Sequence, residues 1–394
     1  MNQFPFLQNP HQEPQNIQAA LERAQEGETF FLARDSYAMY PHGGKHFFCA
    51  LSNSEPADML SAGVLLKDKC NLTIDGQWSA FLCHGQMTAL ALINCHKITL
   101  QNFIIDWDIP LTAEGIITHA AIDHVDLRVD PEKYPFHIQD GSLWFDGGDW
   151  SQMLHCWGHT EFDLKRKRLA PHRGDRFPPT RQELLSNGQI RFWGDFTEKI
   201  PTTGNVLVLR QGKRIHPAVL IHNCSEICLK NIRVHGSGGL GILAQFSDTL
   251  TFSHVDLVPN QKQGRLFAGI HDDGIHLCAN RGQVLIENCR FFGLMDDPVN
   301  LHGIAVKSEK QLNGYTLLGS FMHPQSKGHS LWARPGDTVA ILSGETMQEI
   351  QIVTVKYFKL LDKTHFEISF YELLDCLHLQ SCSSFSLENI SSTA

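Results

Sequence analysis

The segment HDDGIHLCANRGQVLIENCRFFGLMDDPVNLHG, which spans His271–Gly303, holds two copies of one pattern. Asp272-Asp273 is followed by Gly-Ile-His-Leu, and Asp296-Asp297, 24 residues later, is followed by Pro-Val-Asn-Leu. The stretch between them, VLIENCRFF, begins with the alternation of apolar and other residues that is typical of a β-strand. A repeat of this length without a helical segment indicates that the chain returns to the same place once per repeat.

The strand pattern of this segment recurs along the chain. Each copy reads apolar, any, apolar, any, then Asn or His, and the copies are Ile98–Asn102, Ile227–Asn231, Leu250–His254 and Val284–Asn288, with an earlier one from Leu72. Strands that recur mostly every 23 to 26 residues predict the coils of a parallel β-helix, because parallel neighbours cannot be joined by tight hairpins. We expect the Asn positions to stack at one corner of these coils.

Two long segments interrupt the repeat. Residues 111–205 read as β-hairpins rich in Trp, Pro and charge, and residues 305–375 contain the hairpin DTVAILSGETMQEIQIVTVKYF. We therefore predict an all-β chain in five parts: a short helix through Ile17 and Leu21 with the first coils in 1–110, an inserted β-domain in 111–205, central coils with the site in 206–304, a second inserted β-domain in 305–375, and the truncated start of a further coil in 376–394.

The two Asp-Asp pairs fall into one register of the predicted coils, together with Gly239-Leu240 of the preceding copy. Neighbouring strands lie about 4.7–4.9 Å apart, so carboxylates from successive coils are expected to lie close together. Repulsion then raises the pKa of at least one of them. A carboxylic acid beside a carboxylate is what the cleavage of a glycosidic bond requires. Turn capping, a calcium site and a purely structural solenoid remain the alternatives.

Several residues near the Asp-Asp pairs suit a sugar site. His276, Asn300 and His302 follow the pairs at corresponding positions and could donate hydrogen bonds to hydroxyl groups, or could be buried residues of the coils. Asp106 and Trp107 end an earlier coil, where an indole face could stack on a sugar or belong to the core. Gly238, Gly239 and Gly241 are predicted to leave room for a sugar ring.

Composition narrows the classes of partner. The net charge of −9 argues against nucleic acid as a partner, because phosphate binding needs a basic surface. No apolar run reaches the length of about 18 residues that a membrane span needs. Neither the 22 histidines nor the 11 cysteines form a metal-binding motif, so we predict no metal and no cofactor. The N-terminus lacks the pattern of a signal peptide, which favours a cytoplasmic location, with the periplasm or secretion as the alternative if a leader was lost.

These motifs resemble those of glycoside hydrolase family 110. The resemblance rests on NLTIDGQWSAFLCHGQMTALALINCHKITLQNFIIDWDIP, on the His271–Gly303 segment and on the IQAAL start. It implies a right-handed parallel β-helix with two inserted small β-barrels, and an exo-α-galactosidase that releases α-1,3-linked galactose with inversion and without metal. It places the catalytic carboxylates on Asp273, Asp296 and Asp297, with Asp272 in a supporting role. A diagonal from Asp273 to Asp296 or Asp297 is expected to meet the spacing of about 6.5–9.5 Å that inversion requires.

Two other classes of function stay open. One is a different β-helix enzyme, either a polygalacturonase-like hydrolase or a calcium-dependent pectate lyase. The other is an inactive glycan-binding β-helix, because family members usually continue with several more coils where this chain ends. In each case the expected partner is a glycan, with galactose at its end for the first hypothesis. A homo-oligomer is also compatible with the sequence, since an open end of the coils would expose unpaired strands.

Overall fold

The structure is a computed structural model that describes residues 14–154, 159–171, 177, 179–374 and 385–390. This part of the chain is built almost entirely from strands, with one α-helix, α1 (Pro14–Arg23), and three 3-10 helices, η1 (Pro41–Gly43), η2 (Gln261–Gln263) and η3 (Pro324–Ser326). The prediction of an all-β chain with a short N-terminal helix is therefore confirmed. None of the helices in these residues has the length and apolar character needed to cross a membrane.

The first parallel sheet contains most of the strands that carry the sequence repeat. Its strands lie in the order β1-β5-β7-β19-β21-β23, with β2 paired to β5 and β24 paired to β21. All of these pairings are parallel. The strands are β1 (Thr29–Phe31), β2 (Ser36–Met39), β5 (Cys70–Cys83), β7 (His96–Trp107), β19 (Ser225–Val234), β21 (Asp248–Leu257), β23 (Arg281–Glu287) and β24 (Arg290–Phe291).

The second parallel sheet runs in the order β25-β22-β20-β18-β6-β4-β3, in which only the β3–β4 pair is antiparallel. Its strands are β3 (Lys45–Phe47), β4 (Leu60–Lys67), β6 (Thr88–Ile93), β18 (Val219–His222), β20 (Ile242–Gln245), β22 (Ile275–Cys278) and β25 (Val299–His302). From β4 to β7 and again from β18 to β23, consecutive strands alternate between the two sheets. The chain therefore passes each sheet once per repeat, as the sequence pattern predicts.

The strand register agrees with the alignment of the sequence copies. The Cα partners across the first parallel sheet join, in turn, Leu72, Ile98, Ile227, Leu250 and Val284. The fifth position of the last four copies has a left-handed backbone, with φ of 62°, 53°, 55° and 53° at Asn102, Asn231, His254 and Asn288. Asn is one of the few residues that adopt this conformation readily. The amide of Asn231 also donates to Oδ1 of Asn102 at 3.0 Å, so these two residues stack as predicted.

Apolar side chains from both parallel sheets form one continuous core. Within the repeats they occupy alternate positions of each strand, for example Ile98 and Leu100 on β7, both fully buried. Helix α1 packs on this core through Ile17 and Leu21, which are 6% and 1% exposed. The chain turns at Gly27, whose φ of +81° suits glycine, shortly after the helix.

The residues between β7 and β18 form a separate, largely antiparallel unit with its own core. A seven-stranded sheet, β14-β13-β17-β8-β9-β16-β15, is accompanied by the three-stranded sheet β10-β11-β12. The strands are β8 (Thr112–Ala120), β9 (His124–Val129), β10 (Phe136–Gln139), β11 (Ser142–Asp146), β12 (Ser151–Met153), β13 (Thr160–Asp163), β14 (Arg168–Leu169), β15 (Pro179–Leu184), β16 (Ile190–Gly194) and β17 (Val206–Arg210). We call this unit the first insertion.

The residues after β25 form a closed barrel in the order β26-β27-β30-β29-β28-β31. The strands are β26 (Val306–Asn313), β27 (Thr316–Phe321), β28 (Thr338–Ser343), β29 (Glu349–Leu360), β30 (His365–Phe370) and β31 (Phe385–Ile390). The predicted hairpin is the antiparallel β28–β29 pair. Strand β31 corrects one expectation, because it pairs with β26 and β28 instead of beginning a further coil. The remaining residues of 376–394 lie outside the described part of the chain.

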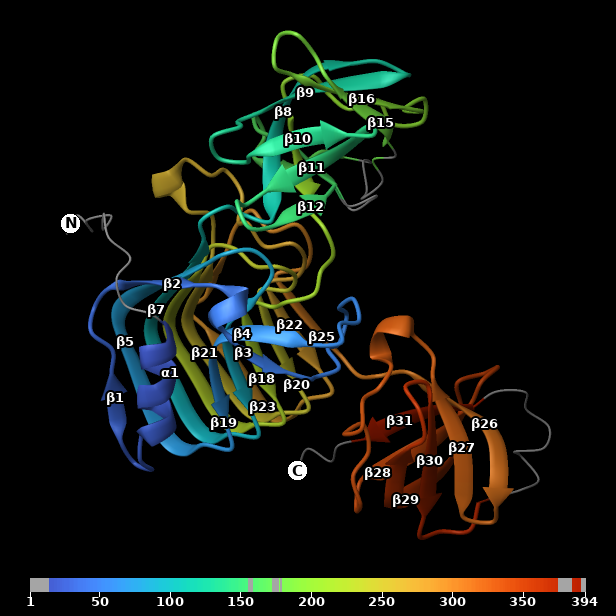
Figure 1. Ribbon diagram of the computed structural model, residues 1–394. Coiled ribbons are helices and arrows are strands. Elements are labelled where there is room, and N and C mark those ends of the chain that lie inside the picture. The colour runs from blue at the N-terminus through green and yellow to red at the C-terminus, as the bar shows by residue number, and fades with distance from the viewer. Residues whose placement is uncertain (1–13, 155–158, 172–176, 178, 375–384, 391–394) are drawn as a thin grey trace.

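Figure 1 shows how the two added units lie against the parallel sheets. The first insertion, in green, extends from one side of the sheets, and the barrel, in orange and red, lies beside β25. Strands β23 and β25 are the last members of their sheets. The turn that leads into β25 carries Asp296 and Asp297, so the second Asp-Asp pair lies at this end of the sheets.

Candidate active site

The two Asp-Asp pairs lie in equivalent turns that lead into neighbouring strands. Ile275 of β22 pairs with Val299 of β25, which aligns Asp272 with Asp296 three residues earlier. The backbone continues this alignment into the turns, because the amide of Gly274 donates to the carbonyl of Asp297 at 2.9 Å. The register inferred from the repeat is therefore confirmed. It follows from the parallel pairing of β22 and β25, which fixes equivalent residues side by side.

This alignment brings three of the four carboxylates together. Oxygens of Asp273, Asp296 and Asp297 lie within 4.8 Å of one another. Asp273 is buried, whereas Asp296 and Asp297 are exposed, so the cluster is open to solvent from one side. The spacing between these oxygens is shorter than the diagonal of about 6.5–9.5 Å that was expected. Carboxylate oxygens at these distances can share a proton or bind a small cation.

The environment of Asp296 favours its protonated form. Partial burial raises the pKa of its carboxyl, and the negative charges of Asp273 and Asp272 raise it further, to about 6. The charge of Arg210 and the hydrogen bond from the amide of Asp297, 3.0 Å from Oδ1 of Asp296, act in the opposite direction and are weaker. A carboxyl with a raised pKa can act as a general acid near neutral pH.

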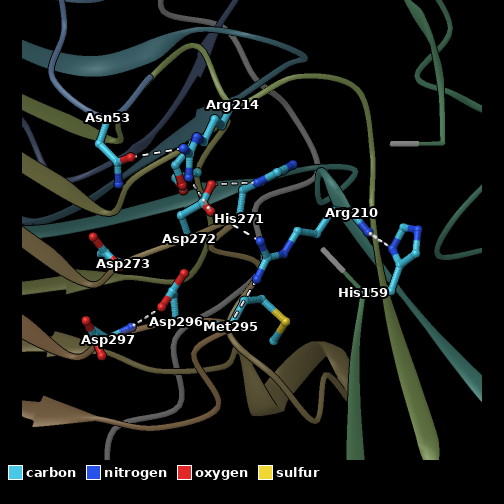
Figure 2. Close-up of polar contacts among 12 residues, drawn as sticks. Asn53, His159, Arg210, Arg214, His271, Asp272, Asp273, Met295, Asp296 and Asp297 are labelled. Carbon is cyan, nitrogen blue, oxygen red and sulfur yellow. Dashed lines mark hydrogen bonds and ion pairs between the residues drawn. The ribbon is translucent and has the colours of Figure 1, made fainter. Parts of the chain in front are cut away.

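Asp272 has a different environment from its neighbour Asp273. Its Oδ1 accepts hydrogen bonds from Arg210 at 3.2 Å and from Arg214 at 3.1 Å, and its Oδ2 lies 2.7 Å from Nδ1 of His271. Burial alone raises the pKa of the Asp272 carboxyl, but the charges of His271 and the two arginines outweigh it and hold the pKa well below its usual range. Figure 2 shows Asp272 facing the arginines, apart from the other three carboxylates.

The arginines beside Asp272 were not identified from the sequence. Arg210 ends β17 of the first insertion and also donates to the carbonyl of Met295 at 3.2 Å, directly before Asp296. Arg214 donates from Nη2 to Asn53 at 2.9 Å and to Gln325, in η3 of the barrel, at 2.7 Å. These contacts join both added units to the turn that precedes β22.

The polar residues predicted on the strands after the Asp-Asp pairs lie beside one another. His276 on β22 is buried, and Asn300 pairs with it on β25 and is half-buried. Nδ1 of His276 lies 2.7 Å from Oδ2 of Asp273, and its Nε2 lies 2.8 Å from Nε2 of His302. Asp273 is thus connected through His276 to the half-buried ring of His302.

The assignment of Asp106 and Trp107 to substrate binding is wrong. Trp107 is fully buried in the core between the sheets, and its indole N–H donates to the carbonyl of Gly85 at 2.8 Å. Asp106 is buried as well and accepts hydrogen bonds from Arg265 at 2.8 Å and from Asn260 at 2.7 Å, which anchor the loop after β21. Neither side chain offers a surface to a sugar.

The glycines of the preceding turn also have a different role from the one predicted. A Cβ at Gly241 would lie 2.5 Å from the carbonyl oxygen of Gly274, and one at Gly238 would lie 2.3 Å from the side chain of Gln86. The missing side chains therefore allow neighbouring segments to pack closely. They leave no open space for a sugar ring at these positions.

Known proteins with similar sequences support the resemblance drawn from the motifs. Residues 113–207 match the family model described as GLAA-B beta-barrel domain I. The chain is 35% identical over 310 residues to Alpha-1,3-galactosidase B of Bacteroides thetaiotaomicron, a match that covers 77% of this chain and 50% of the relative. It is 28% identical to Alpha-1,3-galactosidase A of Bacteroides fragilis, with 90% and 59% covered, and 28% identical to Alpha-1,3-galactosidase B of Phocaeicola vulgatus, with 93% and 63% covered.

The chain thus spans from half to somewhat less than two thirds of the length of these relatives. The matched region includes the family-model domain, which corresponds to the first insertion. These matches confirm the resemblance to glycoside hydrolase family 110, and the chain is a homologue of the α-1,3-galactosidases of that family over about half of their length.

Proposed function

We propose that this chain is an exo-α-galactosidase that hydrolyses terminal α-1,3-linked galactose of glycans. The observation that carries the proposal is the convergence of oxygens of Asp273, Asp296 and Asp297 within 4.8 Å, together with the raised pKa of Asp296. A protonated carboxyl beside carboxylates provides both the acid and the base that glycoside hydrolysis needs. The names of the relatives supply the linkage and the sugar.

We assign the general acid to Asp296. Its carboxyl is exposed to an incoming glycan and retains a proton up to a pH of about 6. Asp273 and Asp297 then act as the base that removes a proton from water. Asp272 takes no direct part, because its carboxylate is buried among Arg210, Arg214 and His271.

Inversion at the anomeric carbon is part of the proposal and comes from the family resemblance. The nearest oxygens of the three carboxylates are closer than the separation of about 6.5–9.5 Å found in inverting enzymes, and nearer to the separation of about 5–5.5 Å found in retaining enzymes. Identifying the anomer of galactose that is released first therefore decides between inversion and retention.

We also infer that the two parallel sheets are faces of a right-handed parallel β-helix, with inserted β-domains at 111–205 and 305–375. The alternation of consecutive strands between the two sheets supports this architecture. In such a fold the turns that precede β22 and β25 lie along one edge, where a glycan can reach Asp296 and Asp297 from solvent.

The experiment that tests this function is incubation of the chain with α-1,3-, α-1,4- and α-1,6-linked galactosides, followed by NMR of the earliest product. We expect release of β-galactose from the α-1,3-linked substrate. Release of α-galactose first would refute inversion while leaving the galactosidase activity in place. No release from any of the three would refute the enzymatic function and favour a glycan-binding protein.

A calcium-dependent lyase is the second candidate, because the spacing of the three carboxylates also admits a divalent cation. A lyase needs a basic side chain to remove a proton from the sugar. The two arginines nearest in this site, Arg210 and Arg214, are both paired with Asp272. Activity that disappears in a chelator and returns with calcium would favour the lyase, and activity that persists favours the hydrolase.

A further inference from the structure

Three short contacts connect Asp273 to a backbone carbonyl through two histidines. Oδ2 of Asp273 lies 2.7 Å from Nδ1 of His276. Nε2 of His276 lies 2.8 Å from Nε2 of His302, and Nδ1 of His302 lies 2.6 Å from the carbonyl oxygen of Gly303. Both nitrogens of each ring therefore take part in one continuous series, which we call the His276–His302 pair.

The number of protons in this series follows from the chemistry of its members. A carbonyl oxygen carries no hydrogen, so the last contact requires a hydrogen on Nδ1 of His302. Each of the other two contacts also requires one hydrogen between its two atoms. Two imidazoles and one carboxyl thus share three protons. Either Asp273 is ionised and the rings share one positive charge, or Asp273 is protonated and both rings are neutral.

The surroundings decide between these two arrangements. An isolated imidazole binds a proton at a pKa of about 6.5, well above the value of about 3.9 for an aspartate, so the third proton belongs on the rings. The negative charge of Asp273 favours a positive charge on His302. Burial lowers the pKa of His302, and the charges of His276 and of His323 from the barrel lower it further, so the pair holds one charge and not two.

We propose that the His276–His302 pair positions and ionises Asp273: the two rings share one positive charge through a proton between their Nε2 atoms, and Nδ1–H of His276 donates to Oδ2 of Asp273. This proposal rests on the proposed hydrolase function and adds two positioning residues to it. With Oδ2 occupied, Oδ1 of Asp273 faces the water that attacks the sugar. As the water oxygen bonds to the anomeric carbon, its proton passes to Oδ1 of Asp273. The electron pair of the broken C–O bond goes to the leaving oxygen, which takes the proton of Asp296.

The shared proton can be observed without any turnover. In protein labelled with ¹⁵N-histidine, we expect Nδ1 of both rings to be protonated at pH 5 and one further proton to lie between the two Nε2 atoms. His302→Gln, which keeps a polar contact to His276 but cannot carry the charge, assigns the signals and should return His276 to a neutral ring. Two neutral rings in the unmodified chain, with no proton between their Nε2 atoms, would overturn the proposal.

The second readout is the acidic limb of the pH profile of kcat/KM with a synthetic α-galactoside. His302→Gln should shift the midpoint of this acidic limb to a higher pH by about one unit, because Asp273 loses its positive neighbour and holds its proton more tightly. His46→Gln, on an exposed histidine of β3, is the matched control and should leave the limb unchanged. If His302→Gln lowers kcat/KM equally at every pH and the midpoint of the acidic limb stays the same, the His276–His302 pair has only a structural role and the proposal is refuted. Absence of turnover in the unmodified chain would refute the hydrolase but leave the NMR result standing.

Discussion

Arg210 and Asp272 form an ion pair in which both side chains are almost fully buried, at 7% and 1% exposure, with 3.2 Å between Nη1 and Oδ1. Arg210 belongs to the first insertion, and Asp272 belongs to the turn before β22. Because Arg210 also binds the carbonyl of Met295, one guanidinium holds both Asp-Asp turns. The ion pair therefore contributes to the stability of the fold and also holds the two Asp-Asp turns in place at the site.

Breaking this ion pair should destabilise the chain. Asp272→Asn removes the negative charge that both arginines face, and an unpaired buried charge costs about 3–5 kcal/mol of unfolding free energy. Chemical denaturation at pH 7 measures the loss. The pair of His124 with the exposed Asp123 provides the control, and Asp123→Asn should change stability little. Equal stability of the Asp272→Asn variant and the unmodified chain would contradict the role assigned to the pair.

The contribution of Asp272 should also depend on pH in one direction. Its pKa is lowered in the folded chain, so its stabilisation is present above the unfolded pKa of about 3.9 and is lost as the pH falls through the folded pKa. The difference in stability between the unmodified chain and Asp272→Asn should therefore be constant from pH 5 to 7 and should shrink below about pH 4. A difference that grows on acidification would have the wrong sign.

Asp296 should limit activity at alkaline pH. Its carboxyl loses its proton above a pH of about 6, and a general acid is inactive without its proton. We expect kcat/KM to fall by about tenfold per pH unit above that value, which gives about a 100-fold loss by pH 8. Initial rates with an α-galactoside between pH 4 and 8 measure this limb. A flat profile up to pH 8 would exclude Asp296 as the acid.

The same residue should cost stability at neutral pH. The pKa of Asp296 is raised in the folded chain, so the native state binds its proton more tightly, and stability falls as the pH rises from about 4 to about 6. Asp296→Asn should therefore raise the melting temperature at pH 7.5 and leave it nearly unchanged at pH 4. A variant that is less stable at pH 7.5 would contradict the repulsion inferred among the carboxylates.

The stacked Asn positions should show a backbone effect. Asn231 has a φ of 53° and donates to Asn102, so Asn231→Ala loses a hydrogen bond and places alanine in the left-handed region. We expect a loss of about 1–2 kcal/mol of unfolding free energy. Asn231→Gly should lose less, because glycine adopts this backbone freely, and Lys230→Ala on the exposed neighbour is the control. Equal effects of alanine and glycine would exclude a backbone cause.

The sequence was sufficient to predict the register of the strands around the site. Alternating apolar residues fix which side of a strand is buried, and the Asn or His at the fifth position marks a left-handed residue that recurs in the four later copies. These two sequence features align Asp272 with Asp296 without a register error, and the pairing of Ile275 with Val299 agrees with this alignment. Local periodicity and local backbone chemistry are both visible in the chain itself.

Two kinds of error had different physical causes. Asn102 has a left-handed backbone, and the buried apolar residues that follow it on β7 are Phe103, Ile105 and Trp107. Counting alternate positions from Asn102 therefore places the indole of Trp107 in the core. The arginines could not be found in this way. Arg210 and Arg214 reach Asp272 from 62 and 58 residues away, and their contact depends on how the first insertion returns to the sheets. The place of strand β31 in the barrel depends on its long-range pairing with β26 and β28, because a barrel strand and a coil strand share one local pattern.

The most direct test of the account compares the turnover of an α-1,3-linked galactoside by Asp273→Asn, Asp296→Asn and Asp297→Asn with turnover by the unmodified chain and by Asp123→Asn. If the three carboxylates act together on the glycosidic bond, each of the first three substitutions should lower kcat by at least about 100-fold, the scale of losing a general acid or base, while Asp123→Asn keeps full activity. Full activity in all three would contradict the central claim, since the carboxylates would then be neighbours without a shared reaction.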